Sequence, residues 1–295
     1  MKRTITCTNT SSNTSLILGD EFSPFVLNDV EGIYTVDVNV NSIENSMIDG
    51  SFVAGSVIRA RNIVLTITDK ERYGDNRNLL YTLFMPRTEG VLVYEETDGD
   101  FNEKRMISYV VEKIEPGGIG EARTHVISLL CPDPFFTDLN DTYVQMSGWE
   151  SAFEFEHEFL SGGEELGSRV FNKLVNVVND SSVDNLGFTV IFTAEGTVQN
   201  PGLYQAETGN QIQVGTSSLP LRMVSGDQLV ISTVTGNKNA YLISNGIQTG
   251  VNRYIDESSE YIQLKIGNNT LRYFADSGED NLSVSISFRY RYQGV

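Results

Sequence analysis

The sequence predicts a mainly β protein with two domains. Tyr and Phe are frequent, with 13 and 15 residues against a single Trp, and the apolar segments are short and rich in β-branched residues, as strands are. Turn-forming Gly and Asn residues separate these segments, and only one segment has helical spacing. A chain of 295 residues is long enough for two ordinary domains, each with its own core.

The first segments predict short strands and a long loop. Residues 16–18 and 22–27 are apolar, and Pro24 favours an edge strand for the second run. Residues 34–40 alternate strictly between apolar and polar side chains, which predicts a half-buried strand. Residues 41–55 are predicted to form a polar loop. Loops of that length are usually functional, and reaching over to a neighbouring subunit is one such function.

A strand over residues 55–67 and a helix over residues 78–85 come next. Asp75 is the expected N-cap and Pro86 the stop. A helix of about ten residues is marginal alone, so it must pack on a sheet. Its apolar stripe consists of Leu79, Leu80, Leu83 and Phe84.

The first domain is expected to end near Pro132-Asp-Pro134. Segments 90–94 and 105–114 flank an Asp98-Gly99 turn and predict a hairpin, and a strand over residues 123–130 follows. The two prolines fix φ and remove two ladder donors, so that strand cannot continue through them. We therefore expect an N-terminal domain of residues 1–138 and a C-terminal domain of residues 139–295.

The C-terminal domain is predicted to be an antiparallel β-sandwich, because short strands alternate regularly with turn signals. Asn200-Pro-Gly202 is one such turn signal, and residues 283–292 alternate as a last strand should. Residues 164–178 fit either a helix or a strand, and a strand over 173–178 is favoured. The other strands are expected at residues 153–159, 187–193, 203–206, 211–214, 228–233, 239–244, 254–255, 261–266 and 271–274.

The charge is strongly acidic, with 21 basic against 39 acidic residues and a net charge of −18. Up to and including Asp138 there are 12 basic and 21 acidic residues, and after it 9 and 18, so the balance is −9 in each part. The acidity therefore belongs to both domains. It argues against binding to nucleic acid and to anionic membrane surfaces, which require basic patches.

Candidate chemical sites are few. Cys7 and Cys131 lie in different regions without a CxxC pattern, so neither a disulfide framework nor a zinc site is indicated. His125 and His157 lie in predicted strands of different domains, and no nucleophile signature accompanies them. We expect no catalytic, cofactor-binding or metal-binding residues, no cofactor and no enzymatic activity.

Two other patterns are also discounted. The run from Asp98 to Glu103 superficially resembles a calcium loop, but Glu103 and Tyr109 occupy the positions that require Gly and Glu. The glycines of residues 116–120 and 162–167 lack the strand–GxGxxG–helix context of a dinucleotide site. Neither a signal peptide nor an 18-residue apolar window is present. We therefore expect a soluble protein made in a cytoplasm.

Residues 55–136 resemble a known family in the order of their elements. That order is strand, lone helix, hairpin, strand and double-proline exit. Its most specific pieces are Arg61-Asn-Ile-Val-Leu-Thr-Ile67, Phe84 to Pro86 followed by Gly90 and Tyr94, Cys131-Pro-Asp-Pro-Phe-Phe136, and the ending Ser287-Phe-Arg-Tyr-Arg-Tyr-Gln-Gly-Val295. Together they cover most of the chain, and they resemble the distal tail proteins of siphophages.

The resemblance implies a structural virion protein at the phage tail tip, made in the host bacterial cytoplasm. Residues 1–138 would form a β-sandwich or barrel-like domain that assembles into a homo-hexameric ring. The ring would join the tail tube protein to the tail-associated lysin or fibre hub protein. DNA would pass through its lumen without sequence-specific binding, and nothing would insert into a membrane. The C-terminal domain would be a galectin-like jelly roll, an outer platform for receptor-binding proteins.

Two other function classes stay open. A carbohydrate-binding module would use the C-terminal sandwich to recognise a host cell-wall glycan. Galectins place a His, Asn and Arg cluster beside a Trp, but here the single Trp149 has no such cluster near it in the sequence. A hydrolase has the least support, because no acid/base pair is identifiable from spacing.

Overall fold

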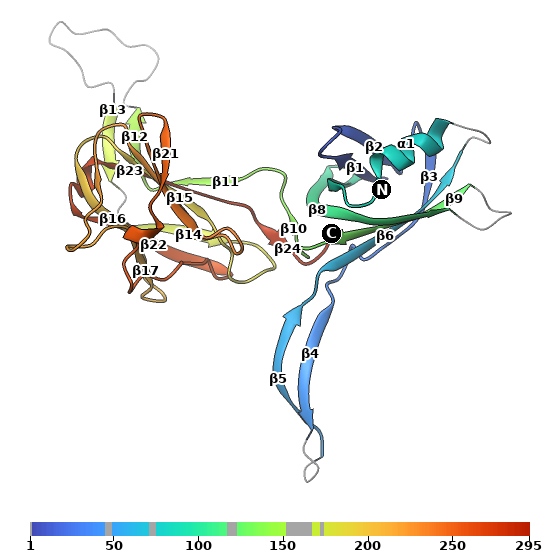
Figure 1. Cartoon of the computed structure of the whole chain (residues 1–295), viewed down its shortest axis with the longest axis horizontal. Helices are drawn as coiled ribbons and strands as arrows, with labels where there is room; N and C mark the ends of the chain where they lie inside the picture. Colours follow the sequence, from blue (N-terminus) through green and yellow to red (C-terminus); the bar gives the residue numbers. More distant parts are fainter. Residues whose placement is uncertain (1, 45–48, 71–74, 117–122, 152–166, 172–173) are drawn as a thin grey trace, which may run out of the picture. The chain divides into compact units, whose positions relative to one another are not determined.

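The fold is that of a computed structural model, which describes residues 2–44, 49–70, 75–116, 123–151, 167–171 and 174–295. The chain divides into two compact units (Figure 1). Unit 1 comprises Met1–Leu139 together with Arg291–Val295, and unit 2 comprises Asn140–Tyr290. The sequence placed the last five residues in the C-terminal domain, whereas in the structure they lie in unit 1.

Unit 1 is built on one nine-stranded antiparallel sheet. Its main path runs β2-β1-β7-β8-β9-β6-β3, and β10 joins β24 to β8. The edge strands β2 and β3 approach each other without forming a ladder, so the sheet curls into a partly closed barrel. The strands are β1 (Lys2–Asn9), β2 (Thr14–Leu18), β3 (Phe25–Glu31), β6 (Arg61–Asp69), β7 (Glu89–Asp98), β8 (Phe101–Pro116), β9 (Thr124–Cys131), β10 (Phe136–Thr137) and β24 (Arg291–Tyr292).

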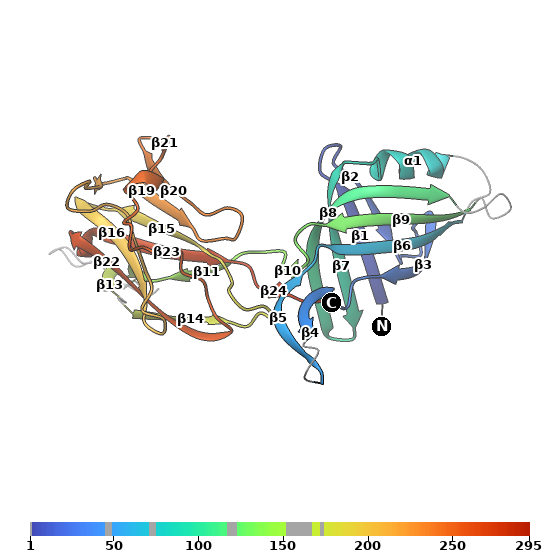
Figure 2. The same ribbon diagram turned by 60° about the horizontal axis from the view of Figure 1, so that its bottom comes forward.

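The helix predicted over residues 78–85 is present as α1 (Asp75–Leu83), which lies beside β2 (Figure 2). It starts three residues earlier than predicted, so Asp75, the expected N-cap, is its first residue. Leu80, Leu83 and Phe84 are fully buried in the core of unit 1, as the apolar stripe predicts. Helix α1 ends before Pro86, and the Asn9 side-chain amide donates to the main-chain oxygen of Leu83 over 3.1 Å. That bond satisfies a terminal carbonyl of the helix.

The segment between β3 and β6 is the main difference from the sequence prediction. Strands β4 (Val38–Glu44) and β5 (Ser51–Ile58) pair only with each other and extend away from the rest of unit 1 (Figure 1). Residues 41–55 are therefore mostly strand and not loop. The expected strand over 55–67 is two strands, β5 and β6, and the expected half-buried strand over 34–40 begins only at Val38 and is mostly exposed.

Unit 2 is an antiparallel sandwich. One sheet has the order β11-β23-β15-β19-β20-β21, and the other has the order β14-β22-β16-β17 with β18 beside β16. Strands β12 and β13 form a separate pair. The strands are β11 (Thr142–Gln145), β12 (Ser147–Ser151), β13 (Gly167–Phe171), β14 (Leu174–Asn179), β15 (Thr189–Ala194), β16 (Val198–Gln205), β17 (Gln211–Gln213), β18 (Arg222–Met223), β19 (Gln228–Ser232), β20 (Asn239–Ser244), β21 (Ile247–Gly250), β22 (Gly267–Ser277) and β23 (Leu282–Phe288).

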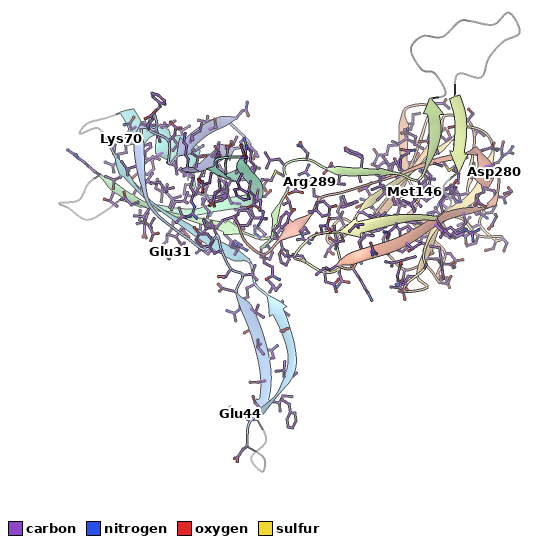
Figure 3. All side chains as sticks on the ribbon, turned by 180° about the vertical axis from the view of Figure 1, so that it is seen from behind. Glu31, Glu44, Lys70, Met146, Asp280 and Arg289 are labelled. Atoms are coloured by element: carbon purple, nitrogen blue, oxygen red, sulfur yellow. The ribbon has the colours of Figure 1, made fainter. Side chains whose placement is uncertain are left out.

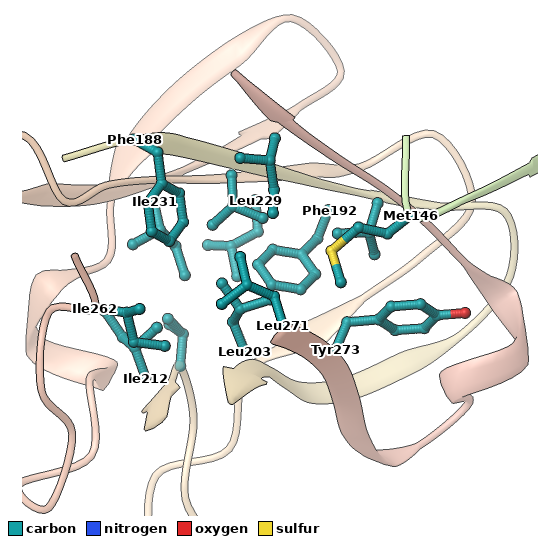
Figure 4. Close-up of a cluster of buried hydrophobic side chains, with 14 of the residues drawn as sticks. Met146, Phe188, Phe192, Leu203, Ile212, Leu229, Ile231, Ile262, Leu271 and Tyr273 are labelled. Atoms are coloured by element: carbon teal, nitrogen blue, oxygen red, sulfur yellow. The ribbon is translucent and has the colours of Figure 1, made fainter. Parts of the chain in front are cut away.

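The two sheets of unit 2 enclose one apolar core (Figure 4). Phe192 and Leu229 come from one sheet and Leu203, Leu271 and Tyr273 from the other, and all five are fully buried. The mainly β class and the galectin-like sandwich predicted from the sequence are confirmed. The favoured strand over 173–178 is also present, as β14.

Four local predictions for unit 2 are wrong. No strand forms at residues 254–255, because Tyr254 ends a 3₁₀ turn of Asn252–Tyr254 and Ile255 forms only a single bridge with Val214. Asn200-Pro-Gly202 lies inside β16 and is not a turn, because the Asn200 side chain bonds both Asp276 and the Leu221 amide at a φ of 51°. Residues 261–266 form a single bridge, between Leu264 and Leu186, and no strand. The expected last strand ends at Phe288. The predicted strand at 153–159 lies outside the described residues.

Candidate assembly surface

The arm, which we define as the β4–β5 hairpin of residues 38–58, carries an unusual amount of exposed apolar surface. Phe52 and Val53 are 61% and 69% exposed, and each described residue of β5 is exposed. The remaining exposed apolar side chains of the arm are Val38, Val40, Ile43, Val57 and Ile58. None of them belongs to the core of unit 1.

The register of the arm places apolar side chains on both of its faces. Val38 lies opposite Ile58 near the base, and Ile43 lies opposite Phe52 near the tip. Val38 and Ile43 are five residues apart along β4, and successive side chains of a strand point to opposite faces. The two apolar pairs therefore lie on opposite faces of the ribbon, with the register shift between Asn41 and Ser42 separating them.

The arm is also nearly free of charge. Residues 38–58 contain no Lys or Arg, and their only acidic residues are Glu44 and Asp49 at the tip, in a chain with 60 charged side chains in all when Lys, Arg, Asp and Glu are counted. An isolated two-stranded hairpin is at best marginally stable in water. An apolar ribbon with so few charges is typical of a surface that becomes buried against a partner.

The base of the arm is held firmly to unit 1. The Arg59 amide donates to the Asp37 carbonyl over 2.9 Å and closes the hairpin. Arg61, 3% exposed, donates from Nε to the Pro134 carbonyl and from Nη1 to the Gly32 carbonyl, each over 2.7 Å. The two chain segments that lead into and out of the arm are thus fixed to the core.

The structure does not bring the sequence-level candidate residues together into a chemical site. His125 is buried on β9, and burial lowers its pKa. His157 lies outside the described residues. Cys7 and Cys131 are both buried, and burial raises the pKa of both thiols, that of Cys131 to about 12.

The acidic run around Asp98 forms a hairpin tip in the structure. Asp98 on β7 pairs with Phe101 on β8, and Gly99 adopts a φ of 60° in the turn between them. Among the described residues, no group of three or more His, Cys, Asp or Glu side chains could hold a metal ion. Most of residues 116–120 and 162–167 fall outside the described residues.

One face of unit 2 presents an aromatic side chain among polar ones. Tyr273 points into the core, so its neighbour Phe274 lies on the outer face of β22. A Cβ atom at Gly202 would lie 2.5 Å from Cζ of Phe274, so the ring rests over the glycine of the next strand. Tyr204 and Arg272, paired across β16 and β22, lie beside it on the same face.

The family comparison covers much of unit 2. Residues 184–292 match the model of the siphovirus-type tail component, C-terminal domain. The resemblance to the siphophage distal tail proteins, inferred from the sequence, is therefore confirmed. No curated protein sequence matches the chain.

Solved structures extend the likeness to the whole chain. The crystal structure of the Dit protein of phage SPP1, described as a paradigm of the hub adsorption apparatus in phages that infect Gram-positive bacteria, matches with a TM-score of 0.67 and 12% identity over 97% of this chain and 98% of that one. A chain of the phage P2 baseplate, in its activated conformation with Ca, matches with a TM-score of 0.51 and 9% identity over the full length of both. At these identities the likeness concerns the fold, which is the distal tail fold in both units.

The sequence pointed toward the arm but missed its form. The arm could have been located from the absence of Lys and Arg in residues 38–58. The sequence prediction used only alternation and loop length, and neither takes charge into account. Within the described ranges, no helix is long and apolar enough to cross a membrane.

Proposed function

We propose that the chain is a structural protein of a siphophage tail tip whose unit 1 assembles into a hexameric ring. The single observation that carries this proposal is the arm, because its exposed apolar side chains have no partner surface in its own unit. The distal tail fold supports the tail-tip role, and the ring is the assembly that the family resemblance implies. Burial of the arm against a neighbouring subunit of the ring would explain why residues 38–58 contain no Lys or Arg and only two acidic residues.

In such a ring each subunit donates its arm to the next and receives one. The ring would join the tail tube to the tail-associated lysin or fibre hub protein, and the sandwich of unit 2 would be the attachment platform. The net charge of −18 suits a protein that lies beside a polyanion without retaining it. No catalytic step is part of this function.

Light scattering and negative-stain microscopy test the ring. The purified chain is expected at six times its mass of 32.7 kDa and as ring-shaped particles. In the variant Ile43→Thr/Phe52→Thr/Val57→Thr, β propensity is kept while apolar surface is removed. We expect this variant to be monomeric. Its midpoint of urea unfolding should equal that of the dissociated wild-type monomer, because the three side chains are outside the core. Val234→Thr, at another exposed apolar position, is the control. A monomeric wild-type chain, or rings that survive the triple substitution, would contradict the role of the arm.

A second candidate function, glycan binding by unit 2, is favoured by the face around Phe274. Gly202 pairs with Phe274 on one side and with Gln213 on the other, and Arg272 lies two residues from Phe274, so Phe274, Arg272 and Gln213 share one face. An aromatic ring with polar side chains on the same face is the combination that small-molecule sites use. The test is saturation-transfer NMR of the full chain with cell-wall oligosaccharides. Transfer signals that are unaffected by Phe274→Ala, or the absence of any transfer signal, would exclude this face as a glycan-binding site.

A further inference from the structure

The loop of residues 19–24, between β2 and β3, displays the most exposed large apolar side chain of the described residues. Phe22 is 88% exposed. Ile17 on β2 and Val26 on β3, which flank the loop, are 48% and 44% exposed. We call Ile17, Phe22 and Val26 the seam patch, because they lie along the two edge strands that approach each other without pairing.

The loop that carries Phe22 is held in place by hydrogen bonds. Asp20 Oδ1 accepts from the Phe22 amide over 2.9 Å, and Asp20 Oδ2 accepts from Lys2 Nζ over 2.7 Å. The Lys70 amide donates to the Pro24 carbonyl over 3.0 Å, and Lys70 Nζ donates to the Glu21 carbonyl over 2.7 Å.

Gly19 lets this loop lie directly against β1. It adopts a φ of +82°, and a Cβ atom there would lie 2.4 Å from the Arg3 carbonyl oxygen. A loop seated this closely presents Phe22 at a defined position although the side chain contributes nothing to the core. Binding to a pre-organised side chain costs less ordering entropy than binding to a mobile one, so Phe22 is suited to be an anchor in an interface.

The arm and the seam patch match in chemistry. Both are apolar, and the arm tip bears the only two charges of the arm, the carboxylates of Glu44 and Asp49. Beside Phe22 in the loop, the carboxylates of Asp20 and Glu21 are balanced by two ammonium groups, that of Lys2 on Asp20 and that of Lys70 on the Glu21 carbonyl, so the match between the two surfaces is apolar and not ionic. The free edges of β2 and β3 are also templates for an added strand. We propose that the arm of one subunit packs on the seam patch of the next copy of this chain.

The arm and the seam patch lie at opposite ends of β3. Phe22 precedes the first residue of β3 and the arm follows its last, and seven residues of strand span about 23 Å. Figure 3 shows Glu44 at the tip of the arm and Lys70 at the other extremity of unit 1, with Glu31 between them. A contact between such different surfaces is heterologous, and a heterologous contact gives a closed ring when the rotation closes. This inference rests on the proposed ring and names its contact surfaces.

Disulfide cross-linking of the full chain tests the contact. Glu21→Cys is combined in turn with Ser42→Cys, Ser51→Cys or Ser56→Cys, three exposed positions along the arm. Mild oxidation of at least one pair is expected to give a ladder of covalent oligomers on non-reducing gels. Each single-cysteine variant should give none. The pairs in which Glu21→Cys is replaced by Asn102→Cys, near the start of β8, should also give none. The native Cys7 and Cys131 are buried and do not compete.

A second variant measures the anchor. Phe22→Ala is expected to raise the concentration at which half of the rings dissociate by at least tenfold, without changing the unfolding midpoint of the monomer. Phe101→Ala, which removes another exposed Phe, should leave assembly unchanged. Rings without any cross-linked pair, or with Phe22→Ala no weaker than Phe101→Ala, would overturn the seam contact and leave the ring assignment standing. A wild-type chain that never assembles would overturn both.

Discussion

Arg61 and Gln293 are joined by a hydrogen bond across 232 residues of sequence, from the guanidinium Nη2 to the main-chain carbonyl. The same guanidinium binds the Gly32 and Pro134 carbonyls. Arg61 therefore holds three segments of unit 1 together: the segment before the arm at Gly32, the segment after β9 at Pro134, and the chain end at Gln293. Its planar fork of donors suits this role, which the single ammonium group of a lysine could not fill.

Removing this guanidinium should destabilise unit 1. We expect Arg61→Met to lower the free energy of unfolding by about 3 kcal/mol or more, because three carbonyls lose their donor in a buried site. Urea unfolding of the full chain measures it. Arg59→Met, two residues earlier and exposed, is the matched control and should cost less than about 0.5 kcal/mol. Equal losses in the two variants would refute the role given to Arg61.

The returning chain end should be part of the folding unit. Arg105 donates to the Gly294 carbonyl and lies 3.9 Å from the centroid of the Tyr292 ring, while Arg291 pairs with Asp133. A fragment of residues 1–138 lacks these contacts. We expect it to melt several degrees below a chain in which a Gly/Ser linker joins residues 1–139 to residues 291–295.

Thermal unfolding of the two fragments, followed by circular dichroism, makes the comparison. The linked chain should also form rings, whereas unit 2 alone, as residues 140–290, should be monomeric because the arm is in unit 1. If residues 1–138 melt at the same temperature as the linked chain, β24 contributes nothing to unit 1. If residues 140–290 are the part that assembles, the arm is not the assembly element.

The stability of the protein should fall at mildly acidic pH because of His125. Burial lowers its pKa below the usual 6.5, with nearby Arg77 acting in the same direction and Asp69 opposing, and its Nδ1 has no hydrogen-bond partner among the residues that the structure describes. A His with a lowered folded-state pKa binds its proton more readily in the unfolded chain. Stability is therefore complete above about pH 6.5 and declines as the pH falls below it.

The measurement is urea unfolding of the wild type and His125→Gln between pH 5 and 8. The wild type should lose up to about 1.4 kcal/mol per pH unit more than the variant over the part of this range below pH 6.5, the limit for one proton. The other acidic groups titrate in both proteins and cancel. Parallel pH profiles would show that His125 is not the group responsible.

Both thiols should be inert in the folded protein. Cys7 and Cys131 are fully buried, and the pKa of Cys131 is raised to about 12 and that of Cys7 still further, so the reactive thiolate is scarce at pH 8. Under native conditions, we expect neither thiol to react with Ellman's reagent within minutes. After denaturation in about 6 M guanidinium, both thiols should react, giving two equivalents of released dye per chain. Rapid reaction of the native protein would contradict the burial of these residues.

Period-two alternation and helical spacing were enough to predict the mainly β class and the presence of the helix. These are local signals: Cys131 ends β9 because the next residue has no amide proton to donate. The family resemblance rested mainly on residues 55–136 and on the chain end, whereas the family model matches residues 184–292. The candidate site was predicted only as a segment suited to reach a neighbour, in residues 41–55.

Only the tertiary structure decided what surrounds each strand. Val38 and Val40 alternate with Asn39 and Asn41 as in any half-buried strand, yet in the structure they are exposed on the arm, because alternation fixes which side chains share a face and not what covers it. Likewise, Arg291 and Tyr292 continue the alternating pattern of β23 but pair with β10 in unit 1. Strand pairing between distant segments depends on the path of the whole chain, which the local sequence of a strand does not encode.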